Sequence, residues 1–259
     1  MFELSILLMI IIFMFGGFLK GWSGFGTNLV VPPLLLFMSR FDDLKVIMII
    51  VVTVNLFLNL AMLVQNKKFN LKYLYNIRIL VAVGILFNIV GVLFFESVGE
   101  TLFKVLMGVM ILLVTLNRIF KMKFHFKELN WKHYTVTGII SGILNGMFGL
   151  GGIPLLILLG STKMDKNEFK STLVTYFAIM NVIFIILHGI IGSTYSTFVF
   201  TNILIALPFA VVACLLGVFF SSRVSDKIFQ RVMNAVLIFF GLNMIYVGIF
   251  GEHIFNLFN

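Results

Sequence analysis

One lysine and two groups of glycines interrupt long apolar runs of this sequence, and together they could bind an anion. Lys20 lies in an otherwise apolar segment, where an ammonium group costs several kcal/mol unless it meets water or a counter-charge. Glycines that break a helix leave free N–H groups at the start of the helix that follows, and these groups favour an anion. We therefore interpret Lys20 as an anion contact; the alternative is a lysine that extends its side chain to the membrane interface.

The glycine pattern occurs twice, which indicates an internal duplication. The segments after the two breaks, 29–38 and 153–160, are too short to cross a hydrocarbon core of about 30 Å and are predicted to be half-helices. Irregular backbone at this depth must line a cavity or be buried in protein. The first copy has Gly17, Leu19, Gly21, Gly24 and Gly26, and 125 residues later the second has Gly142, Leu144, Gly146, Gly149 and Gly151.

We expect the substrate to lie between the two breaks, in contact with backbone amides and polar side chains. Asn145 is the repeat partner of Lys20 and could supply amide donors. Asn55 and Asn181 could bind substrate or join helices, and Phe25 could close the cavity or pack in the core. The candidate substrate-binding residues are Lys20, Gly24, Phe25, Gly26, Thr27, Asn28, Asn55, Asn145, Gly149, Gly151, Gly152 and Asn181.

The acidic residues are informative because they are missing from the apolar spans. All 10 lie at span ends or in loops, which disfavours a cation cage or a carboxylate proton relay. His188 is then the one intramembrane group that titrates near neutrality, with a coupling role or a helix-packing role open to it. No cofactor, metal site or nucleophile–base pair is expected, so an enzyme is disfavoured.

The composition excludes a soluble globular domain. With 61% hydrophobic and 11% charged residues, the chain is expected to be an integral membrane protein. A net charge of +9 would suggest nucleic acid in a soluble chain, but here the basic residues fall in short loops and set orientation. The expected partners are a small anion and the lipid bilayer, without nucleic acid, and a homodimer is allowed.

The predicted fold class is an all-α polytopic membrane protein with two inverted repeats, each a broken, re-entrant helix hairpin plus three transmembrane helices. The first repeat covers 1–125, with broken helix 4–38 and spans 43–64, 73–95 and 101–120. The second covers 126–259, with broken helix 133–160 and spans 168–190, 197–220 and 228–250.

The basic loops predict the orientation. Lys67 and Lys68 fall in one loop and Lys121 and Lys123 in another, and both loops are expected on the cytoplasmic side. If each broken segment dips in and returns, the basic loops of the second repeat also face the cytoplasm. Both termini are then extracellular and the protein is a multi-pass protein of the plasma membrane.

At the glycine breaks the sequence resembles the sulfite exporter TauE/SafE family of membrane permeases. The residues that carry the resemblance are GFLKGWSGFGTNLVVPPLL from Gly17 to Leu35 and GILNGMFGLGGIPLLILLG from Gly142 to Gly160. The resemblance implies a carrier for sulfite or a related organosulfonate anion. Thr27 and Asn28 stand where family members often continue with glycine, and Ile153 and Leu158 are also departures from the pattern.

Two alternatives to a carrier that works by alternating access stay open. An anion channel of the same architecture would use the same residues but conduct ions without saturable, counterflow-capable uptake. A membrane scaffold would use the glycine breaks for helix packing alone. The sequence leaves open which anion moves, its direction and the coupling ion.

Overall fold

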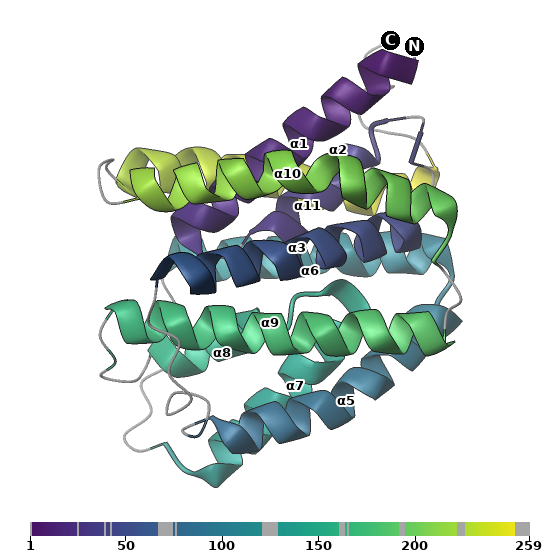
Figure 1. Ribbon diagram of the computed structural model, residues 1–259. Helices are drawn as coiled ribbons and strands as arrows, with labels where there is room; N and C mark the ends of the chain where they lie inside the picture. Colours follow the sequence, from purple (N-terminus) through teal and green to yellow (C-terminus); the bar gives the residue numbers. More distant parts are fainter. Residues whose placement is uncertain are drawn as a thin grey trace.

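The computed structural model is a bundle of helices (Figure 1), and it describes residues 2–24, 26–38, 40–41, 43–66, 75, 77–120, 129–160, 164, 166–191, 195–221 and 226–251. Every regular element in these ranges is a helix. The helices are α1 (Phe2–Ser23), α2 (Thr27–Leu35), α3 (Leu44–Asn66), α5 (Arg78–Ser97), α6 (Glu100–Phe120), α7 (Trp131–Phe148), α8 (Gly152–Gly160), α9 (Lys166–Ile191), α10 (Thr197–Phe220) and α11 (Asp226–Phe250).

Seven of the described helices are long and apolar enough to cross a membrane: α1, α3, α5, α6, α9, α10 and α11. At 1.5 Å per residue, the 24 residues of α10 reach about 36 Å. The short helices α2 and α8 have 9 residues each, about 14 Å, and cannot cross alone. The prediction of an all-helical, multi-pass membrane protein is confirmed.

The first helix break lies between α1 and α2. Gly24 and Gly26 take φ values of 83° and 118°, in the region that side chains with a Cβ rarely adopt. The carbonyl of Gly26 accepts hydrogen bonds from the amides of Leu29 and Val30. Because of these bonds the short helix begins at Thr27, two residues before the predicted start.

The second break follows α7. The amide of Gly149 donates to the carbonyl of Asn145, and the amide of Leu150 donates to the carbonyl of Leu144. The bond from Gly149 to Asn145, with φ of 63° at Gly149, is the αL ending of a helix. Helix α7 therefore ends at the glycine-rich segment, as the sequence pattern predicts.

Both short helices fold back along the long helix that precedes them. The Thr27 hydroxyl donates to the Gly16 carbonyl, with 3.1 Å between the oxygens, although Gly16 lies well before the end of α1. In the second hairpin, the Ser141 hydroxyl donates to the Gly151 carbonyl. Each break is therefore the tip of a helix hairpin.

Glycines let two pairs of long helices pack closely. A Cβ on Gly142 of α7 would overlap the carbonyl oxygen of Gly84 and lie 3.0 Å from the amide nitrogen of Asn88, both in α5. A Cβ on Gly17 of α1 would overlap the Ala210 carbonyl oxygen in α10. Figure 1 shows α1 beside α10 and α5 beside α7. Small residues at such contacts let helix backbones approach in a membrane.

We predict that Gly142→Ala destabilises the fold. The added methyl group meets backbone atoms of α5, which cannot rotate away, and such overpacking costs about 1 to 3 kcal/mol. The melting temperature of the purified protein should fall by several degrees. Gly99→Ala is the matched control, because a Cβ there has no atom within 4 Å. Equal melting temperatures for the two variants would contradict this account of the α5–α7 contact.

Candidate functional site

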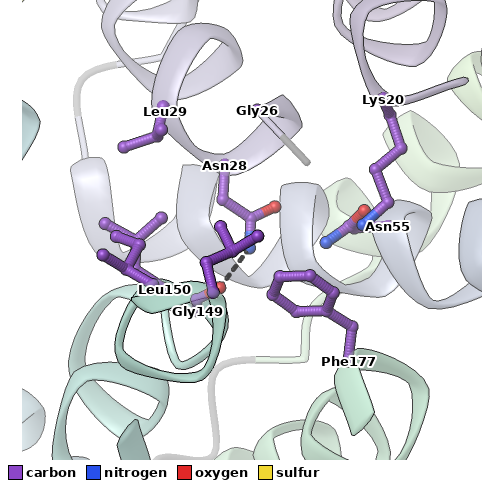
Figure 2. Close-up of a pocket in the computed structure, with 10 residues that line it drawn as sticks. Lys20, Gly26, Asn28, Leu29, Asn55, Gly149, Leu150 and Phe177 are labelled. Atoms are coloured by element: carbon purple, nitrogen blue, oxygen red, sulfur yellow. Dashed lines mark hydrogen bonds between the residues drawn. The ribbon is translucent and has the colours of Figure 1, made fainter. Parts of the chain in front are cut away.

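A pocket lies between the two hairpin tips (Figure 2). The space among its lining residues is about 310 Å³ when the open solvent at its mouth is counted. Helices α1, α2, α3, α8 and α9 and the second break all contribute to its wall. The lining residues are Lys20, Gly26, Asn28, Leu29, Asn55, Gly149, Leu150, Ile153, Leu156 and Phe177.

Lys20 is the only charged residue in this lining. Its side chain is buried, with 1% of the residue exposed, and its Nζ lies 4.3 Å from the ring centroid of Phe177. Neither ion pair among the described residues involves Lys20. The last turn of α1 carries the lysine, so the negative end of the helix dipole offsets part of its charge. A ring face and a dipole balance a buried ammonium only partly, and the site therefore favours an anion.

Asn28 joins the two hairpins. Its Nδ2 donates to the carbonyl oxygen of Gly149 over 2.6 Å, drawn as the dashed line in Figure 2. A Cβ on Gly149 would lie 2.6 Å from the same Nδ2, so this close approach also depends on glycine. The bond ties the first turn of α2 to the second break and closes one side of the pocket.

Two buried oxygens of the lining have no hydrogen-bond partner among the described residues. They are Oδ1 of Asn28 and Oδ1 of Asn55. Buried polar atoms are nearly always satisfied by protein, water or ligand. Figure 2 shows both side chains directed toward the space that Lys20 and Phe177 border. The pocket thus combines one cationic donor with acceptors that can receive an O–H or N–H group.

The structure brings five of the predicted site residues to this pocket: Lys20, Gly26, Asn28, Asn55 and Gly149. Of the other seven, six lie elsewhere and one lies outside the described residues. Thr27 faces Gly16 of its own hairpin through its hydroxyl. Gly24 forms the first break but does not line the pocket, and Phe25 lies outside the described residues.

The remaining predicted residues lie behind the pocket, where the second hairpin packs on α9. Asn145 donates from Nδ2 to the Met180 carbonyl over 3.1 Å. A Cβ on Gly152 would overlap the Phe177 ring, and one on Gly151 would lie 2.6 Å from the Cβ of Asn145. Asn181 is fully buried, and neither of its amide atoms has a hydrogen-bond partner among the described residues.

Half of the pocket wall was not predicted. Phe177 contributes the ring that faces Lys20, and Leu29, Leu150, Ile153 and Leu156 are apolar. In a chain with 61% hydrophobic residues, single apolar side chains give no signal that separates a pocket from a core. Only the position of Leu29, Leu150 and Ile153 beside the glycine breaks could have indicated them.

Two comparisons relate this chain to known proteins. The chain is 30% identical over 167 residues to a protein of Cupriavidus necator described as a probable sulfite/organosulfonate exporter TauE. This alignment covers 63% of the chain and 65% of the relative, so the chain spans somewhat less than two thirds of that protein's length. No solved structure matches the chain. A sequence model of the sulfite exporter TauE/SafE family matches residues 9–244, and the chain therefore belongs to the sulfite exporter TauE/SafE family.

Proposed function

We propose that this protein is a secondary transporter that moves a small sulfur-containing anion through the pocket between its two hairpin tips. The observation that carries the proposal is the buried Lys20 ammonium, which faces the pocket without a carboxylate partner among the described residues. An anion in the pocket would supply the missing counter-charge. The N-terminal turn of α2, through Gly26 and Asn28, adds N–H groups and the positive end of a helix dipole.

The substrate is sulfite or a related organosulfonate. The name of the Cupriavidus necator relative supports this class. A sulfonate or sulfite group carries its charge on several oxygens, which suits one ammonium together with backbone amides. The acceptors Asn28 and Asn55 can receive a hydroxyl or amine on the rest of the substrate.

Alternating access is the mechanism that we infer, with the two hairpins as inverted elements. Lys170, near the start of α9, donates from Nζ to the carbonyl of Gly21 near the tip of the first hairpin, over 3.3 Å. His188, near the end of α9, contacts the carbonyl of Gly146 near the tip of the second hairpin. Hairpins that contact one helix near its two ends, while their tips meet at the pocket between, support inverted repeats that move against each other.

In the proposed orientation the basic loops lie on the cytoplasmic side of the plasma membrane and both termini are extracellular. Several of those loops fall outside the described residues, including Lys67, Lys68, Lys121 and Lys123. A homodimer stays part of the proposal, with one pocket in each protomer.

We predict that Lys20→Met reduces transport. Methionine keeps the apolar length of the side chain but removes the charge, and a lost charge-assisted contact costs about 1.5 to 3 kcal/mol, tenfold or more in binding. Uptake of radiolabelled sulfite into proteoliposomes below saturation should fall by that factor. Lys132→Met is the matched control: Lys132 lies over the ring of Trp131 at 5.9 Å, on the exposed start of α7. Equal uptake by both variants would remove Lys20 from the mechanism.

We also predict that the protein is a carrier and not the alternative anion channel. Preloading the vesicles with unlabelled sulfite should accelerate uptake of labelled sulfite, because a carrier returns faster when it is loaded. The initial rate should saturate with concentration. Unitary currents in a planar bilayer, together with uptake that does not saturate, would favour the channel.

A further inference from the structure

A second polar cluster lies away from the pocket, where α5, α7 and α9 meet. Nδ1 of His188 lies 3.1 Å from Oε1 of Glu96, and Nε2 of His188 lies 3.3 Å from the carbonyl oxygen of Gly146. The His188 side chain is fully buried, whereas 27% of the Glu96 side chain is exposed. Neither residue lines the pocket. The cluster thus connects a buried imidazole to the aqueous edge of the bundle through one carboxyl group.

The hydrogen bonds of this cluster require one proton more than its ordinary groups supply. A carbonyl oxygen can only accept, and an ionised carboxylate can only accept. A neutral imidazole has a single N–H, so one of the two contacts of His188 would place a lone pair against an oxygen. One added proton, either on the imidazole or on the Glu96 carboxyl group, turns both contacts into hydrogen bonds.

The groups around His188 and Glu96 keep water away from the imidazole, and few other charged residues lie near it. The rings of Phe95 and Phe184 pack on it, with centroids 4.4 and 4.1 Å from that of the imidazole. From α3, Lys45 donates from Nζ to the backbone carbonyl of Glu96 over 3.1 Å. Other described charges at this end include Asp43, which accepts from the amide of Lys45, Arg40, which lies 5.4 Å from the ring centroid of Phe198, and the ion pair of Glu100 with Lys104 on α6.

We propose that His188 and Glu96 together bind one proton, and that this proton is the ion coupled to anion transport. The proton enters from water at the exposed Glu96 carboxylate and is then shared with Nδ1 of His188, while Nε2–H continues to donate to Gly146. Release reverses these steps and returns the proton to water. The coupling part of the proposal rests on the proposed transport function, whereas the proton site does not.

The contact with Gly146 explains how binding of the proton at His188 affects the pocket. Gly146 is in the last turn of α7, and its carbonyl is one of those that a helix end leaves without an intrahelical partner. An imidazolium there faces the negative end of the helix dipole and holds the hairpin tip against α9. Loss of the proton weakens this contact. Gly149, three residues further on, forms the pocket wall, so the tip cannot shift without changing the pocket.

The coupling is tested by anion accumulation in proteoliposomes. Isethionate is the probe, because a sulfonate stays ionised and cannot carry the proton itself. A pH difference of one unit sustains about a tenfold anion gradient for one proton per anion. We expect this accumulation with the wild-type protein, and no accumulation with Glu96→Gln or His188→Gln. Both variants should still exchange labelled for unlabelled isethionate.

The matched control is Glu100→Gln, which makes the same carboxylate-to-amide change at the same end of the bundle, on a residue with 44% of its side chain exposed. It should accumulate isethionate like the wild type. Accumulation that persists in both Glu96→Gln and His188→Gln would overturn the coupling role and leave the transport function intact. Absence of any saturable flux of sulfite or isethionate with the wild type would instead reject the proposed function.

The proton site has a test that does not depend on transport. The chain has 4 histidines, so replacing His125, His133 and His253 by glutamine leaves His188 as the one imidazole seen by ¹⁵N nuclear magnetic resonance. The ¹⁵N signals of His188 should change with pH. Adding Glu96→Gln should move the pH at which they change. Adding Glu100→Gln should leave that pH where it is. Signals that stay constant between about pH 5 and 9, or that are insensitive to Glu96→Gln, would overturn the proton site.

Discussion

The balance of charge around Lys20 is the constraint on which the pocket depends. Burying the charge of Lys20, a residue with 1% of its surface exposed, is expensive, and the ring of Phe177 and the end of the α1 dipole offset this cost only in part. A carboxylate in the same wall would neutralise the lysine and leave no reason for an anion to enter. The placement of the acidic residues at span ends and in loops is therefore part of the design of the site, and not only a consequence of membrane insertion.

Close helix contacts hold the two breaks in the positions that this site needs. Gly17 brings α1 against α10, and Gly142 brings α7 against α5. The long arm of each hairpin therefore packs on a helix long and apolar enough to cross the membrane. The short arm of each hairpin is only 9 residues long, and most of α2 is buried among its neighbours. The Asn28 bond to Gly149 then sets one tip against the other. Rigid outer contacts and a single polar bond at the centre are suited to a pocket that opens and closes.

The sequence predicted the elements better than the directions of side chains. Glycine spacing and hydropathy are local signals, and they gave both breaks, the short helices and the apolar spans. Thr27 and Asn28 are neighbours with similar donors, yet one bonds Gly16 and the other bonds Gly149, because adjacent residues on a helix face different partners. Glu96 is one of the acidic residues predicted to lie at span ends or in loops, and only the packing of α5 on α9 brings it to His188. Such contacts between distant segments leave no trace in spacing.

Helix α9 connects the features that the sequence leaves separate. Lys170 contacts the first hairpin near one end of it, His188 contacts the second hairpin near the other end, and Phe177 lies between them in the pocket wall. A shift of either tip relative to this helix must therefore alter the ring that faces Lys20. In the proposed mechanism, a charge change at His188 and an anion at Lys20 act through this one helix, since a packed helix transmits displacement along its length. The two proposed sites then need no direct contact to influence each other.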